Sequence, residues 1–255
     1  MNKIIKCLNL IREGYSVKDK FVLMLYFVKV AINRISNLKE NRKLIYDVMI
    51  KNEDGKFYCG DNINSVWVAS IFHEKEIRDY FNLKKGIFVD IGSNIGKYTV
   101  RIGRQLKDKG KVISIEPEPN NFDIIKKNVR MNKLNNVILE NLACSSRKGV
   151  LNFYLKKTGT GGHSLVNKTK EKIKVKAEKL DSILSKQKIK KADLIKIDVE
   201  GAEAEVLKGA RKTLKEKPKI IFEAWNKSYL DKIENILKKY NYRIKRISTD
   251  NYLAE

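Results

Sequence analysis

The pattern of apolar and polar positions changes character near residue 86. From Gly86 onward, short runs of β-branched and aromatic residues alternate with stretches whose apolar positions recur at the helical period. The predicted strands are "GIFVDI", "KVISIE", "NVILENLA", "DLIKIDV", "KIIFEAW" and "YRIKRIS". The predicted helices lie near residues 96–108, 119–133, 180–187, 202–214 and 228–239. Such alternation predicts an α/β fold, a Rossmann-like parallel sheet with helices on both faces.

The chain before this core has a different organisation. Residues 1–43 are predicted to be helical, and residues 64–82 to form one further helix. Between them, "LIYDVMIKNEDGKFYCG" predicts two strands joined at Asp54-Gly55, a strong hairpin signal. The predicted organisation is an N-terminal helical segment over 1–43 and a second domain over 44–255. That domain contains the hairpin at 44–60 and the core at 86–255.

Charge is the outstanding feature of the composition. The chain has 54 Lys and Arg against 30 Asp and Glu, a formal net charge of +24. This excess favours acidic partners such as nucleic acid, anionic lipid or phosphorylated substrates, although the lysines are spread along the chain and also suit a solvated surface. Cys7, Cys59 and Cys144 show neither zinc-site nor disulfide spacing, which fits a reducing, cytoplasmic location.

Residues 1–43 combine positive charge with an apolar run. They hold ten basic and three acidic residues, a net +7, and include "FVLMLYFVKVAI" at 21–32. That run is shorter than the roughly 20 residues that a membrane-spanning helix needs. It is compatible with peripheral contact at a membrane surface or with packing against the second domain.

The segment "FVDIGSNIGKYT" at 88–99 has two glycines and a lysine, as phosphate-binding loops do. Gly92 and Gly96 are too close for a Walker loop, which has four residues between its first glycine and Gly-Lys. Asn94 stands where a dinucleotide fingerprint requires its second glycine. The turn is therefore predicted to hold a different ligand.

Carboxylates concentrate at the predicted carboxyl ends of the strands, where ligands of parallel sheets bind. Asp90, Glu116, Asp198 and Glu223 each lie at such an end. A helix begins after the glycine turn, and its free N–H groups suit a ligand carboxylate, while Glu116 is placed to accept hydrogen bonds from a ribose diol. S-adenosylmethionine has both an adenosine ribose and a carboxylate tail, so the sequence predicts it as the cofactor.

Four segments carry a resemblance to the FkbM family of class I methyltransferases. They are "FVDIGSNIGKYT", "IEPEPNNF", "NLA" and "LIKIDVEGAEAEVLKGA", and the resemblance extends over about residues 45–250. It implies an S-adenosylmethionine-dependent O-methyltransferase acting on a hydroxyl of a sugar, glycan or small molecule. The implied contacts of the cofactor's methionine part are Asp90, Gly92, Asn94 and Gly96. Glu116 is implied for the ribose, and Asn141, Leu142 and Ala143 for the adenine.

The resemblance places Asp198 and Glu200 at the mouth of the active site. Either of them, or His163 in the glycine-rich loop "TGTGGHSLV", could accept the proton of an acceptor hydroxyl. Glu200 could equally be an ordinary acid of a helix first turn, and His163 a solvated loop residue. A magnesium site on Asp198, Glu200 and Glu223 is also chemically possible, but spacing does not establish it.

Two other functions remain open on the sequence. The positive charge suggests an RNA methyltransferase, although "DVEG" replaces the Asn/Asp-Pro-Pro-aromatic motif of many enzymes that methylate base amino groups. A basic, non-catalytic binding protein on a degenerate fold is the third hypothesis. The intact set of Asp90, Gly92, Gly96 and Glu116 argues against it.

Overall fold

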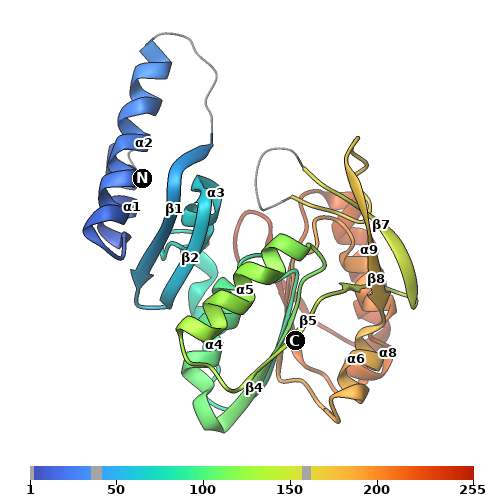
Figure 1. Cartoon of the computed structure of the whole chain (residues 1–255). Coiled ribbons are helices and arrows are strands. Elements are labelled where there is room, and N and C mark those ends of the chain that lie inside the picture. The colour runs from blue at the N-terminus through green and yellow to red at the C-terminus, as the bar shows by residue number, and fades with distance from the viewer. Residues whose placement is uncertain (1–2, 36–41, 157–161) are drawn as a thin grey trace.

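A central sheet organises the fold in the computed structural model, which describes residues 3–35, 42–156 and 162–255 (Figure 1). In these ranges the sheet has seven strands. Their spatial order is β11 (Ile244–Arg246), β12 (Asn251–Ala254), β10 (Lys219–Glu223), β9 (Leu194–Ile197), β3 (Gly86–Ile91), β4 (Gly110–Ile115) and β5 (Val137–Glu140). The predicted Rossmann-like α/β class is confirmed.

The prediction of a parallel sheet is only partly right. The strands from β10 to β5 are parallel, but β12 is antiparallel to both β10 and β11. The pattern does not predict β12, because "NYLA" is too short a run to show a period. The chain leaves β3 toward β4 on one side, while β9 lies on its other side, so strand order reverses at β3. A ligand site is expected at the carboxyl end of this strand.

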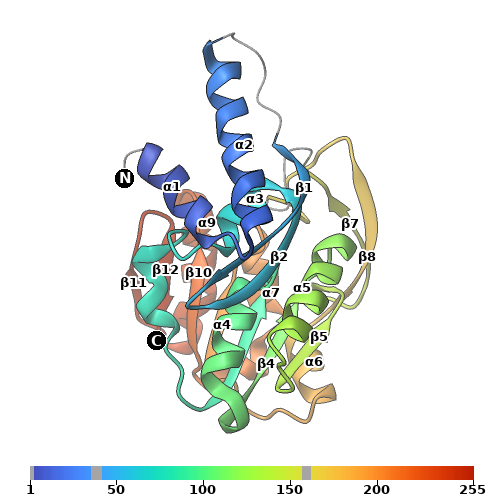
Figure 2. The same cartoon turned by 60° about the vertical axis from the view of Figure 1, so that its left-hand side comes forward.

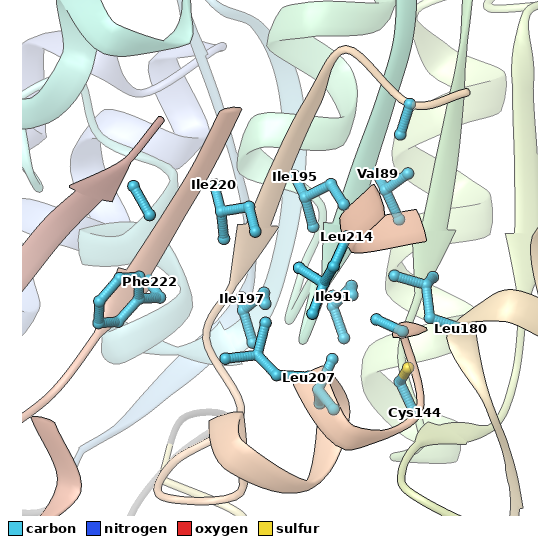
Figure 3. Close-up of a cluster of buried hydrophobic side chains, with 14 of the residues drawn as sticks. Val89, Ile91, Cys144, Leu180, Ile195, Ile197, Leu207, Leu214, Ile220 and Phe222 are labelled. Carbon is cyan, nitrogen blue, oxygen red and sulfur yellow. The ribbon is translucent and has the colours of Figure 1, made fainter. Parts of the chain in front are cut away.

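Helices cover both faces of the sheet (Figures 1 and 2). On one face lie α4 (Lys97–Leu106) and α5 (Pro119–Met131), and on the other α6 (Leu180–Lys186), α7 (Glu203–Lys208), α8 (Arg211–Lys215) and α9 (Lys227–Leu237). Short 3-10 turns η2 (Lys107–Lys109) and η3 (Lys238–Tyr240) follow α4 and α9. The largest apolar cluster lies between the sheet and the second group of helices. Figure 3 shows side chains of β3, β9 and β10, among them Ile91, Ile197 and Phe222, in this cluster with Leu207 and Leu214.

The N-terminal elements form a separate layer beside α4 and α5 (Figure 2). They are α1 (Lys3–Glu13), α2 (Val17–Ile35), β1 (Lys43–Asn52), β2 (Gly55–Asn62) and α3 (Ile63–Ala69), whereas η1 (Lys75–Phe81) packs against the central sheet. β1 and β2 form the predicted antiparallel hairpin. The buried side chains of this layer, including Leu23 and Phe57, share one cluster with Val100 of α4.

The single helix predicted for 64–82 is wrong. α3 ends at Ala69. The next residue, Ser70, has an extended backbone with ψ of 146°, and its N–H donates to the carbonyls of Val66 and Trp67. The two halves pack into different clusters, Val66 with the hairpin and Phe81 with β3. One continuous helix cannot reach both.

Two other predicted elements are also broken. The helix at 202–214 divides into α7 and α8 at Gly209, where an added Cβ would lie 2.1 Å from the Ser145 carbonyl oxygen. The third strand ends at Glu140, and Ala143 instead begins β6 (Ala143–Cys144) of a second sheet. That sheet also contains β7 (Gly149–Tyr154) and β8 (Lys172–Glu178).

Candidate functional site

The turn between β3 and α4 lies against the end of β9. Gly92 has φ of +79°, and a Cβ built on it would lie 1.8 Å from the carbonyl oxygen of Asp198. Its N–H donates to the Ile115 carbonyl at 2.9 Å, so the turn is also tied to β4. Gly96, with φ of +85°, caps α4 in the left-handed region. Because position 92 combines a left-handed φ with this close approach, it accommodates glycine alone.

Asp90 lies buried below this turn. Its Oδ2 accepts a hydrogen bond from Thr99 Oγ1 at 2.7 Å, whereas Oδ1 has no partner in the described part of the chain. Burial raises the pKa of Asp90, with Lys196 opposing. The side-chain oxygen of Asn94 is likewise buried and unpartnered among the described residues. Two orphaned acceptors next to a bare glycine turn fit the ammonium end of an amino-acid ligand.

Glu116 directly follows β4 and is buried, and its carboxyl accepts hydrogen bonds from backbone N–H groups of two different turns. Its Oε2 accepts the Asn94 N–H at 2.8 Å and its Oε1 accepts the Glu118 N–H at 3.0 Å. Burial raises the pKa of Glu116 to about 8, although these two N–H donors lower it. An ionised carboxylate has about four acceptor positions, so a position for a ribose hydroxyl remains beside the two N–H groups and the side chain of Asn121.

The three residues predicted near the adenine have different positions. Ala143 lines the cavity described below, whereas Leu142 packs against the main apolar cluster. The side-chain amide of Asn141 donates to the carbonyl of Glu116 at 2.8 Å. Asn141 thus shapes the turn after β4.

These elements enclose a cavity of about 570 Å³, including its open mouth. Its lining includes Gly92, Asn94, Glu116, Ala143, Cys144, Phe153, His163, Asp198 and Glu200. Predicted cofactor contacts and predicted catalytic residues therefore share one cavity. Its size and its mixture of apolar walls with few polar groups suit a nucleoside ligand.

An ion pair between Lys196 and Asp198 lies at the carboxyl end of β9. Lys196 is buried, and its Nζ lies 2.7 Å from Oδ2 of Asp198, whose side chain is 30% exposed. Burial alone would lower the pKa of Lys196, but Asp198, Glu74 and Asp90 outweigh it and raise that pKa. Lys196 is therefore a fixed cation that holds the Asp198 carboxylate in place.

The neighbouring carboxyls are less acidic than usual. Burial, and next the charge of Asp198, raise the pKa of Glu200 to about 7 and that of Glu223 to about 8. Glu200 has φ of +56° and accepts the Gly162 N–H at 2.8 Å through Oε1. No group of three or more His, Cys, Asp or Glu placed to hold a metal ion occurs among the described residues, so these carboxyls do not form one.

His163 lies at the first cavity, on the part of its loop that the structure describes; residues 158–161 of that predicted loop lie outside it. Its Nδ1 accepts the Lys156 N–H at 2.9 Å, and burial lowers its pKa. A neutral imidazole that accepts at Nδ1 carries its proton on Nε2. In this arrangement the remaining nitrogen is a donor and not a base.

A second cavity, of about 1170 Å³, opens beside the first. The two share Gly92, Asn94, Gly162, Asp198 and Glu200. Its other walls come largely from residues that sequence reasoning did not select, namely Arg42, Asn64, Trp67, His73, Glu74, Lys97 and Asn251. Apart from Lys97, which belongs to "FVDIGSNIGKYT", these residues lie outside the motifs at the carboxyl ends of the parallel strands.

Lys97 is the most unusual of these residues. It is buried in the first turn of α4, where its Nζ donates to the His73 carbonyl, and burial lowers its pKa to about 8. The only signal in the sequence is its place next to Gly96.

Comparisons with known proteins agree with this geometry. The model of the methyltransferase FkbM domain matches residues 90–244. The methyltransferase sdnD of Sordaria araneosa is 25% identical over 233 residues, 78% of this chain and 90% of that protein. The hexuronic acid methyltransferase AglP of Haloferax volcanii is 30% identical over 134 residues, 52% of this chain and 54% of AglP.

Among solved structures, an FkbM methyltransferase from Methylobacillus flagellatus KT superposes with a TM-score of 0.51 and 20% identity. The alignment covers 67% of this chain and 43% of that one, so the present chain spans less than half of its length. The family match, in contrast, extends over more than half of the present chain. The chain belongs to the FkbM methyltransferase family and is an S-adenosylmethionine-dependent methyltransferase.

Proposed function

We propose that the protein transfers a methyl group to a hydroxyl of a sugar, and that Asp198 accepts the hydroxyl proton. The observation that carries the proposal is the position of Asp198. Its carboxyl lies on the wall that both cavities share, and Lys196 holds it at 2.7 Å. S-adenosylmethionine supplies an electrophilic methyl group when bound, so the protein's own task is to orient the acceptor oxygen and remove its proton.

The other candidates for the base are weaker on geometry. With a pKa of about 7, Glu200 is partly protonated at neutral pH, and one of its oxygens already accepts the Gly162 N–H. His163 presents a donor nitrogen, as described above. Glu200 and His163 are therefore assigned to positioning, Glu200 by holding the Gly162 backbone at the cavity.

The residues proposed to bind the cofactor are those with unpartnered buried oxygens and those that line the first cavity. Asp90 and Asn94 would hold the amino-acid end, Glu116 the ribose, and Ala143 with Phe153 the apolar faces of the base. Gly92 and Gly96 allow the backbone to approach closely. The relative from Haloferax volcanii, described as a hexuronic acid methyltransferase, supports an acidic sugar as acceptor, as does the net charge of +24.

A transfer assay with labelled cofactor tests this proposal. Purified protein is offered tetragalacturonate, maltotetraose or bulk tRNA, and the incorporated label is measured in each. We expect label in sugar, and loss of most of it in Asp198→Asn. Label confined to tRNA would establish the RNA alternative and overturn the sugar acceptor.

We also propose peripheral contact of residues 1–43 with an anionic membrane, without a membrane-spanning segment. Within the described ranges no helix is both long and apolar enough to cross a bilayer. The outer side of α2 exposes Val17, Phe21, Met24, Val28 and Ile32, at spacings of three or four residues. Lys18, Lys20 and Lys29 flank this stripe and are also exposed.

The two acids described in this segment are turned inward. Asp19 is buried, and its carboxylate accepts the N–H groups of Ser16 and Met49 at 2.8 and 3.0 Å. Glu13 is buried and accepts the Ile71 N–H. The outer side of α2 is therefore cationic and apolar, which is the combination that anionic lipid surfaces bind. The cytoplasmic location remains a prediction.

A further inference from the structure

The second cavity has a wall built from the N-terminal layer, ahead of the residues that match the family model. That match begins at residue 90, whereas Arg42, Asn64, Trp67 and His73 line the cavity. These four residues therefore lie outside the matched domain, whereas Asp198 lies inside it.

α3 is built to present this wall. Its N-cap Asn62 accepts the Asn64 N–H, which fixes the start of the helix. Ile63, Val66 and Ala69 are buried in the cluster of the N-terminal layer. Asn64, Trp67 and Val68 are half-buried and line the cavity, and Trp67 and Val68 also pack against the edge of that cluster. Offsets of three and four residues put this second set on one helical face.

The buried charges near the floor of the cavity are engaged within the protein. Lys196 pairs with Asp198, and Lys97 donates to the His73 carbonyl. Glu74 in the same lining pairs with His73, whereas Asp90 keeps one oxygen without a partner among the described residues and Asp198 is partly exposed. The solvent-exposed cations in the lining are Arg42 and Lys156, which share the cavity with Trp67 and can meet an anionic ligand that enters from solvent.

The chemistry of that wall is specific. The indole of Trp67 provides a flat apolar surface, steadied by Lys6, whose Nζ lies 3.3 Å from the ring centroid, and by the edge of His73 at 5.7 Å. A pyranose ring has carbon-bound hydrogens that can lie against such a surface, and hydroxyls that suit an amide such as that of Asn64. A guanidinium binds a carboxylate through two parallel hydrogen bonds.

We propose that residues 42–74 form the acceptor subsite for an acidic pyranose, with its ring on Trp67 and its carboxylate at Arg42 and Lys156. This inference rests on the proposed sugar methylation and adds the residues that choose the sugar. It assigns selection of the acceptor to the N-terminal layer, while Asp198 supplies the base.

Tryptophan fluorescence tests the subsite independently of turnover. The chain has two tryptophans, and Trp225 packs edge-on against Tyr229 at 6.0 Å on another element. Trp225→Phe therefore makes Trp67 the sole reporter, and Trp67→Phe serves as the matched control. Each variant, loaded with S-adenosylhomocysteine, is titrated with tetragalacturonate and with maltotetraose.

We expect a saturable change with tetragalacturonate in Trp225→Phe and none in Trp67→Phe. Maltotetraose should bind at least about tenfold more weakly, since it lacks the carboxylate that Arg42 and Lys156 would bind. A signal of equal size in Trp67→Phe, equal affinity for both sugars, or no response of Trp225→Phe to tetragalacturonate would overturn the subsite.

Steady-state kinetics distinguish a wrong subsite from a wrong proposed function. Arg42→Met should raise KM for tetragalacturonate about tenfold, with kcat and the KM for the cofactor nearly unchanged. Arg130→Met, at an exposed position of α5, is the control. If the protein methylates sugars but Arg42→Met behaves like Arg130→Met, the subsite is wrong and the function stands. If no sugar is methylated, the function itself has failed.

Discussion

Gly92→Ala should damage both stability and turnover, because the new methyl group has no room. The built Cβ lies 1.8 Å from the Asp198 carbonyl oxygen, so the end of β9 must move by about 1.5 Å to restore an ordinary contact. The left-handed φ of +79° costs an alanine about 1–2 kcal/mol. Displacing packed backbone costs about 1–3 kcal/mol more, a total of about 2–5 kcal/mol.

Gly60→Ala is the matched control for this change. Gly60 has φ of +62°, and the nearest neighbour of its built Cβ is Tyr58 Cε1 at 4.0 Å, so only the backbone cost applies. In thermal denaturation we expect the Gly92 variant to melt about 5–15 °C below wild type and clearly below the Gly60 variant. Its turnover should fall about 100-fold, because Asp198 is displaced. Equal melting temperatures and equal turnover of the two variants would refute the close approach of the turn to β9.

Four further outcomes are expected. Glu116→Ala should weaken cofactor binding by about 1.5–3 kcal/mol in calorimetry at a pH above 8, where the carboxylate is charged and its hydrogen bonds have this scale; unchanged affinity would exclude Glu116 from the site. Asp198→Asn should bind the cofactor normally yet lose about 100-fold or more in turnover, and near wild-type rates would make Asp198 structural. Burial raises the pKa of Glu116 to about 8 from its ordinary 4.5, so its stabilising contribution is complete below pH 4.5 and is lost as the pH rises toward 8. The ligand-free melting temperature should therefore fall over this range, and less in Glu116→Gln; parallel curves would refute the assignment. Phe21→Glu with Val28→Glu should abolish pelleting with phosphatidylglycerol vesicles while leaving turnover on free sugars intact, and undiminished pelleting would remove α2 as the contact.

Local signals predict most of the central sheet and the cofactor side of the site. Strands such as "GIFVDI" are buried on both faces and show an uninterrupted apolar run, and the glycine turn must follow such a strand directly. Because the strands are parallel, the same adjacency in sequence brings Asp90, Glu116 and Asp198 to one edge of the sheet. Which of Asp198, Glu200 and His163 acts as the base is not predictable in this way. The choice depends on which of their side-chain atoms already take part in hydrogen bonds.

The acceptor side could not be predicted for a different reason. Trp67 and His73 reach the cavity only because α3 stops at Ser70 and the chain turns back through Glu74, which has φ of +53°. An apolar stripe that continues over 64–82 hides this interruption, since both halves are amphipathic and bury their apolar sides in different clusters. Long-range packing decides the break, and periodicity carries no information on it.

The antiparallel β12 has a consequence for the order in which the protein can fold. During synthesis β10 and β11 are complete while β12, which must enter between them, is still to be made. Until residue 254 is available, Ile220, Ile221 and Phe222 form an open apolar strand edge, the kind that pairs with other nascent chains. Since β11 bonds β12 and not β10, the half-finished sheet cannot close this edge with the strand it already has. The central sheet can therefore close on this side only after β12 has been synthesised.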